Sequence, residues 1–172
     1  MQNLVTQGMV SMGQMGATYA GQNAGKRDMG RIREGVRAAL RMDTVYSILA
    51  AVFMILTIPY TIRLFFSGDV TPLMPYARTY IWISALFYIP LSYIFVFRNF
   101  MQGCGYSLLP MLGGVVEMLA RLLFAAAAMG LHSYGLACFC DPAAWICAAV
   151  FLALSYRKVL KKMKIDWGCL QE

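Results

Sequence analysis

Two opposite charges, Glu117 and Arg121, stand one helical turn apart inside an apolar run at residues 110–131. At positions i and i+4 with the acid first, they can pair along one face of a helix. A charged side chain at the centre of a bilayer costs at least about 2.5–3.5 kcal/mol. The pair is therefore either an internal strut or part of a polar path. In the second case Glu117 exchanges a proton or cation, and Arg121 tunes its affinity.

Asp141 is a third charged residue in an apolar region, and Pro142 follows it directly. A helix covering only residues 142–156 would be about 22 Å long, which is too short to cross about 30 Å of hydrocarbon. We therefore expect the helix to begin near Gly135 and to bend at Pro142, because membrane helices tolerate an interior proline. Asp141 would then lie in the outer third of the membrane.

Near the N-terminus, polar side chains recur every three or four residues and form one stripe of a predicted helix. Amides and hydroxyls cannot face lipid cheaply, so the stripe is either the wall of a substrate cavity or a source of hydrogen bonds between helices. A neighbouring row of small residues allows close helix approach. The polar stripe comprises Gln7, Ser11, Gln14, Thr18 and Gln22, and the small row comprises Gly13, Ala17, Gly21 and Gly25. The candidate cavity or ion-path residues are Gln7, Gln14, Thr18, Glu117, Arg121 and Asp141.

The composition is typical of an integral membrane protein. Hydrophobic residues make up 60% of the 172 residues and charged residues only 13%, whereas soluble domains have about 25% charged residues. The net charge of +7 does not indicate a nucleic-acid partner, because the basic residues flank apolar runs as topology signals do. No nucleophile triad, phosphate loop or set of metal ligands is present, so we expect no enzyme, no cofactor and no bound metal. The five cysteines form no CxxC pair and are interpreted as small buried residues.

Apolar runs of about 20 residues predict an all-α integral membrane protein with five transmembrane helices. The predicted spans are residues 4–24, 43–65, 78–97, 110–131 and 136–156, followed by a tail at 157–172. Pro59 and Pro90 are expected to bend the second and third spans.

Basic residues alternate between the connections of these five spans. The connection at residues 26–41 carries six, the connection after the third span carries Arg98, and the tail carries five. The other connections are poor in Lys and Arg. The positive-inside rule then places the 26–41 connection and the C-terminus in the cytoplasm, and the N-terminus outside.

Several stretches together resemble the C-terminal half of a multidrug and toxic compound extrusion (MATE) transporter. Residues 21–28 (GQNAGKRD), with Arg31, Gly35 and Arg37, are similar to the cytoplasmic end of a lobe's second helix in that family. Residues 98–107 (RNFMQGCGYS) resemble the loop after the tenth helix. Residues 114–121 (GVVEMLAR) and the stretch from Gly135 through 141–145 (DPAAW) resemble the eleventh and twelfth helices.

The resemblance implies a twelve-helix, two-lobed exporter that works by alternating access. It would exchange Na⁺ or H⁺ for a small organic cation or drug across a bacterial-type plasma membrane. This chain would match helices eight to twelve, and its partners would be the bilayer and a missing N-terminal lobe. Some members carry a coupling acid in the tenth helix, but the corresponding span here has none. The family's ion-site roles are therefore not transferred to Glu117 or Asp141, and the coupling ion stays unassigned.

Two other functions remain open from the sequence. One is a flippase for lipid-linked saccharides with related architecture, which would need a wider and more cationic cavity. The other is a small, non-transporting membrane subunit that packs on a partner through its glycine-rich first span. The abrupt start at Met1, without a leading loop, favours a truncated transporter but is also compatible with this subunit.

Overall fold

The computed structural model describes residues 2–65, 71, 74–132 and 134–168. These residues form six helices and no strand, which confirms the all-α prediction. The helices are α1 (Gln2–Gly25), α2 (Met29–Phe65), α3 (Met74–Leu86), α4 (Tyr88–Gly103), α5 (Leu108–Gly130) and α6 (Tyr134–Asp166).

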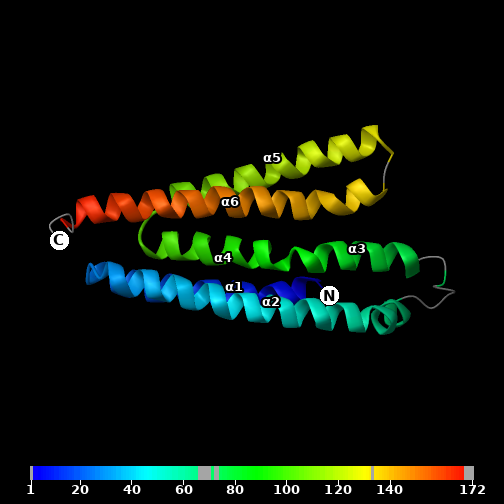
Figure 1. Ribbon diagram of the computed structural model, residues 1–172, viewed down its shortest axis with the longest axis horizontal. Helices are drawn as coiled ribbons and strands as arrows, with labels where there is room; N and C mark the ends of the chain where they lie inside the picture. Colours follow the sequence, from blue (N-terminus) through cyan, green and yellow to red (C-terminus); the bar gives the residue numbers. More distant parts are fainter. Residues whose placement is uncertain (1, 66–70, 72–73, 133, 169–172) are drawn as a thin grey trace.

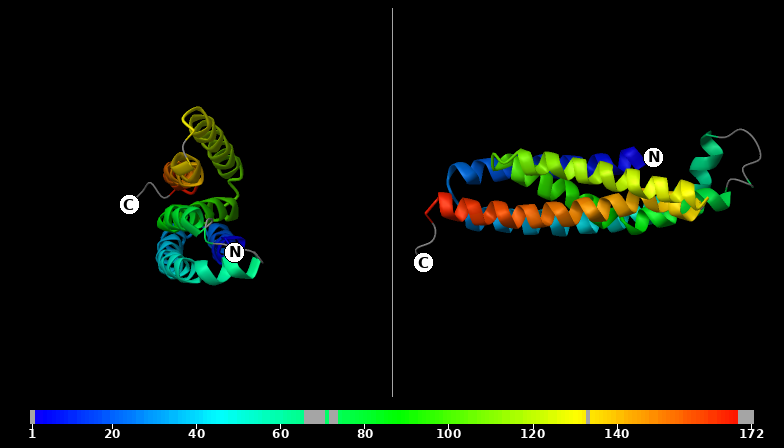
Figure 2. Two further views of the ribbon diagram at one scale, coloured as in Figure 1. Left: turned by 90° about the vertical axis from the view of Figure 1, so that its right-hand side faces the viewer. Right: turned by 90° about the horizontal axis from the view of Figure 1, so that it is seen from above.

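The helices run along one long axis, with connections at both ends of an elongated bundle (Figure 1). One end holds the α1–α2 and α4–α5 connections and the C-terminal end of α6. The opposite end holds the C-terminal ends of α2 and α5 and the N-terminal ends of α3 and α6 (Figures 1 and 2). The basic segment after α1 and the basic end of α6 therefore lie at the same end of the molecule, hereafter the basic end.

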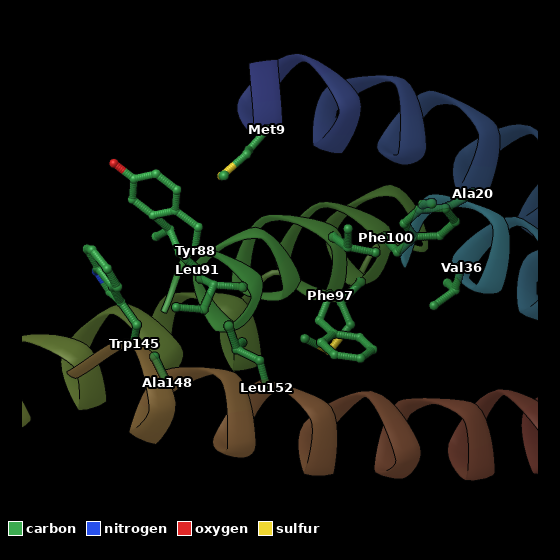
Figure 3. Packing of buried hydrophobic residues seen from close by; sticks show 14 of the residues in the cluster. Met9, Ala20, Val36, Tyr88, Leu91, Phe97, Phe100, Trp145, Ala148 and Leu152 are labelled. Atoms are coloured by element: carbon green, nitrogen blue, oxygen red, sulfur yellow. The ribbon is translucent and has the colours of Figure 1, made fainter. Parts of the chain in front are cut away.

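Helix α4 is central to the packing. It contacts α1 and α2 on one side and α6 on the other, while α5 packs mainly on α6. Figure 3 shows Phe100 directed toward Ala20 of α1, and Phe97 directed toward α6. Trp145, Ala148 and Leu152 of α6 close the core from that side. Large apolar residues recur on both faces of α4 because it is covered on both.

Small residues set the close approach of α1 to α4. The carbonyl oxygen of Ala17 lies so near Gly103 that a β-carbon on Gly103 would overlap it. Gly13 lies against the side chain of Asn99, and Gly16 against the ring of Phe100. This confirms the predicted role of the small row, except at Gly25, where no atom lies within 4 Å of the position a β-carbon would take.

Not every described helix meets the length and hydropathy expected of a membrane span. Among the described residues, three helices are long and apolar enough to span a bilayer: α2, α5 and α6. The bent pair α3 and α4 raises the total to four. Helix α1 has 24 residues, about 36 Å at 1.5 Å per residue, and is long enough to cross a bilayer. Its amides and hydroxyls make it too polar to be included among the candidate spans. The predicted total of five is not confirmed.

The helix boundaries differ from the predicted spans in several places. Most of the expected 26–41 connection belongs to α2, which begins at Met29 and runs without interruption to Phe65. Arg98, expected in a connection, lies inside α4. Helix α6 begins at Tyr134 and continues through Pro142 to Asp166, ten residues beyond the predicted end at 156.

The third predicted span consists of two helices, α3 and α4, with a bend of 46° between them. The break lies at Phe87, three residues before Pro90. Proline lacks an N–H, and its ring clashes with the carbonyl four residues earlier, which is that of Leu86. The predicted bend at Pro90 is thus confirmed, displaced by one helical turn.

Candidate functional site

Glu117, Arg121 and Asp141 come together in the structure, and a fourth charge joins them. Arg121 donates a hydrogen bond from Nε to Asp141 Oδ1 at 2.8 Å and one from Nη2 to Glu117 Oε1 at 3.0 Å. Arg98 Nη2 lies 3.5 Å from the other oxygen of Glu117. The resulting row, Arg98–Glu117–Arg121–Asp141, joins α4, α5 and α6 and is called the charge row below.

The charge row is electrically balanced, with two guanidinium groups and two carboxylates. Its side chains are partly accessible, with exposed fractions of 28% for Arg98, 20% for Glu117, 46% for Arg121 and 35% for Asp141. Each carboxylate already faces a cation, and Glu117 faces two. This arrangement can hold three helices in register, and it leaves no carboxylate of the row without a basic partner.

The sequence analysis did not assign Arg98 to this site. It treated Arg98 as a topology signal in a connection, because the third span was expected to end at residue 97. The available signal was the apolar run that continues past it through Phe100 and Met101, which are both buried. A helix extended to Gly103 places Arg98 at membrane depth, where it needs an acidic partner.

Asp43 is the second unusual charge, and the sequence analysis did not identify it as a site residue. Its side chain is fully buried, with 0% exposure, and neither carboxylate oxygen has a hydrogen-bond partner among the described residues. Two neighbours of Asp43 in α2 make polar contacts with α4: the Thr44 hydroxyl meets the Tyr93 hydroxyl at 3.1 Å, and Ser47 Oγ donates to the Tyr88 carbonyl at 3.4 Å. Asp43 thus lies in the interface that α2 forms with α1 and α4.

No basic residue compensates Asp43 from these two helices. Helix α1 contains no Asp, Glu, Lys, Arg or His, and Tyr19 is its only side chain with a titratable group. Helix α4 carries Tyr88, Tyr93 and Arg98 as its titratable groups, and Arg98 pairs with Glu117 on the α5 side. An isolated carboxylate in such a place is costly, so it is stable only as a neutral acid or with a bound cation.

The sequence analysis missed Asp43 because it placed this residue at the start of a span, next to the connection. The helical spacing of its neighbours was the available signal. The buried positions of α2 recur every three or four residues, and Asp43 occupies one of them. These positions are Ile32, Val36, Ala39, Asp43, Ser47, Ala50, Met54 and Ile58.

The polar stripe of α1 lies away from both sites. Its members Gln7, Ser11, Gln14, Thr18 and Gln22 are all exposed, while the opposite side of α1 packs on α4 and α2. The hydroxyls of Ser11 and Thr18 donate to carbonyls one turn earlier in their own helix. The structure therefore does not join Gln7, Gln14 and Thr18 to the charge row, and it leaves their face open.

The cysteines and the remaining acids are the other possible metal ligands of the chain. The four described cysteines, Cys104, Cys138, Cys140 and Cys147, are free thiols, and Cys169 lies outside the described residues. Burial raises the pKa of Cys104, just after α4, to about 11. In the described part of the chain, no three His, Cys, Asp or Glu side chains gather where they could hold a metal ion.

Comparisons with known proteins support one family. The MatE family model matches residues 2–127, from the start of α1 to within α5. No curated protein and no solved structure matches the chain. The matched region contains Asp43, Arg98, Glu117 and Arg121, whereas Asp141 lies beyond it.

Proposed function

Because the chain belongs to the MatE family of membrane transporters, we propose that it forms part of a secondary exporter. The exporter moves small organic cations or drugs out of the cell by alternating access, in exchange for Na⁺ or H⁺. An opposing lobe completes the substrate cavity, since alternating access needs two bodies that rock around a shared site. The membrane is a bacterial-type plasma membrane, with the basic end and the C-terminus in the cytoplasm.

The observation that carries the ion coupling is the buried carboxyl of Asp43. A coupling site must bind a cation in one conformation and release it in another. Asp43 suits this role because its oxygens have no described protein partner, so that a proton or Na⁺ can neutralise it. Separation of α1 from α2 and α4 would admit water, stabilise the ionised form and release the cation.

The charge row has a different role in this proposal. Glu117, Arg121 and Asp141, together with Arg98, act as a strut that keeps α4, α5 and α6 in register. A carboxylate held by two guanidinium groups has little need for an exchangeable cation. Gln7, Gln14 and Thr18 line the wall that faces the opposing lobe, and their amides and hydroxyls offer hydrogen bonds to a substrate.

Transport by the complete protein tests the role of Asp43. We expect Asp43→Asn, reconstituted in liposomes, to lose efflux of a cationic dye driven by a pH or Na⁺ gradient, while expression stays unchanged. Imposing the two gradients separately identifies the ion. Asp28→Asn is the matched control, because Asp28 pairs with Arg31 at the partly exposed start of α2. Normal gradient-driven efflux by Asp43→Asn would rule out this coupling site.

A second measurement uses the unmodified protein and does not depend on the variant folding. Hydrophobic carbodiimides react with protonated carboxyl groups in apolar surroundings, and mass spectrometry locates the adduct. We expect modification of Asp43 in preference to Glu117, and protection by Na⁺ if Na⁺ is the coupling ion. Preferential modification of Glu117 would instead favour the charge row as the ion site.

A further inference from the structure

A cleft of about 440 Å³ opens at the basic end of the bundle. One wall comes from α2 and the other from α6, and Phe97 of α4 lies between them. Arg33, Arg37 and Arg157 are among the residues that line it, and all three are exposed. Apolar side chains, including Val36, Leu40 and Leu160, supply much of the remaining surface.

Within the described residues, these three arginines have no acidic side chain paired with them. None of them forms an ion pair with an acid in the described part of the chain, where the four ion pairs involve other basic residues. The nearest acid in sequence, Glu34, lines a separate cleft beside Tyr19. Converging like charges repel one another, so the cleft favours a bound anion.

Two aromatic rings form part of the lining of the cleft. Tyr156 and Phe97 both line it, and their rings pack at a tilt with centroids 5.4 Å apart. The Tyr156 hydroxyl is buried, so the ring rather than the hydroxyl faces the cleft. Charged groups and apolar walls in one cleft match an amphiphile with an anionic head and an apolar tail.

Helix lengths place all three arginines outside the hydrocarbon. Residues 44–65 of α2 measure about 33 Å as a helix, enough for about 30 Å of hydrocarbon. Arg37 precedes this stretch by about two turns and Arg33 by about three, so both lie on the headgroup side of its edge. In α6, residues 134–156 are about as long, and Arg157 follows them directly. Both walls thus carry arginines on the side of the hydrocarbon where the lipid phosphates lie.

We propose that this cleft binds one anionic phospholipid, with its phosphate between the three arginines and an acyl chain along Val36, Leu40 and Leu160. Basic pockets between membrane helices bind phosphate-bearing headgroups by this electrostatic principle. A soluble phosphate would satisfy the arginines but not the apolar walls. The site is separate from Asp43 and from the charge row, so it is independent of the proposed transport function.

Native mass spectrometry of the purified, detergent-solubilised protein tests the site with defined lipids. We expect phosphatidylglycerol to be retained over phosphatidylcholine, with a preference of roughly fivefold for each arginine. The triple variant Arg33→Gln, Arg37→Gln, Arg157→Gln should lose this preference. The matched control is Arg31→Gln, Arg41→Gln, Lys164→Gln, which removes the same charge from the same two helices outside the cleft.

Three results would overturn the proposal. The first is equal retention of both lipids by the unmodified protein, which needs no variant. The second is an equal loss of preference in the two triple variants, which would indicate only general surface charge. The third is displacement of phosphatidylglycerol by excess inorganic phosphate, which would assign the site to a soluble anion. If the triple variant does not fold, the single variant Arg157→Gln should still reduce the preference.

Discussion

At the scale of single residues, the charges in this bundle divide into two kinds. The charge row is compensated internally, because each of its carboxylates touches at least one arginine. Asp43 is fully buried, and among the described residues its carboxylate has no hydrogen-bond or ion-pair partner. Paired charges of the first kind can hold helices in a fixed packing. A buried carboxylate of the second kind is costly unless a proton or metal cation neutralises it. This contrast is why we assign coupling to Asp43 and a positioning role to Glu117.

Glu117 is the residue on which the charge row depends most. Glu117→Gln removes the partner of Arg98 and one of the two partners of Arg121, whereas Asp141→Asn affects Arg121 alone. We expect Glu117→Gln to destabilise the folded protein by about 1–2 kcal/mol, a value reduced from that of buried pairs because the groups are partly exposed. Asp141→Asn should cost less.

Thermal unfolding of both variants in the same detergent checks this order. Gradient-driven efflux should survive in correctly folded Glu117→Gln, since the strut does not exchange ions. Loss of efflux without loss of stability would contradict the strut and restore Glu117 as the ion-exchanging group.

At the scale of helices, the packing of α1 on α4 depends on positions without side chains. Gly103 meets the backbone of Ala17, which cannot move aside as a flexible side chain could. Close backbone approach of this kind lets helices associate without a hydrophobic driving force, which is absent in lipid. The polar stripe of α1 stays exposed for the same reason, because the small residues on its other side make the helix contacts.

Gly103→Ala should therefore separate α1 from α4. We expect a loss of about 1–3 kcal/mol, typical of overpacking in a well-packed interior. Gly25→Ala is the matched control, since no atom lies within 4 Å of the added β-carbon, and it should be neutral or slightly stabilising. The unfolding temperatures of Gly103→Ala and Gly25→Ala measure this difference. Equal values would show that the contact between Gly103 and Ala17 does not limit the packing of α1 on α4.

At the scale of the whole molecule, the basic end predicts which side of the bundle faces the cytoplasm. The α1–α2 connection, the N-terminal part of α2 and the C-terminal part of α6 lie together in Figures 1 and 2, and residues 26–41 and 157–164 carry 11 of the 15 Lys and Arg residues, six in the first segment and five in the second. A helical bundle of this length places its two ends on opposite sides of a bilayer. The arginine cleft and the topology signal are therefore on the same side.

Cysteine labelling in intact cells tests this arrangement. In a background without native cysteines, Arg33→Cys and Lys162→Cys should both be protected from a membrane-impermeant maleimide, and His132→Cys should react. His132 is exposed at the end of α5 on the opposite side of the bundle. Labelling of positions 33 and 162 from opposite sides of the membrane would contradict both the fold and the proposed orientation.

The sequence by itself determined the helical class, the membrane setting, the family resemblance and the pairing of Glu117 with Arg121. These properties depend on composition and on neighbours within one or two helical turns, which local spacing records. It also predicted the bend near Pro90 and the close packing of the small row, since proline geometry and the absence of a β-carbon act locally.

Tertiary structure decided the remaining features. Arg98 joins the charge row, Asp43 is buried with no partner among the described residues, and three arginines from α2 and α6 line one cleft. These features arise only when helices distant in sequence pack together. The sequence of a single helix shows which side chains are polar and therefore costly to bury. It does not show which other helix covers them. Burial and counter-charge are properties of the packed bundle, and they distinguish a strut from an ion site.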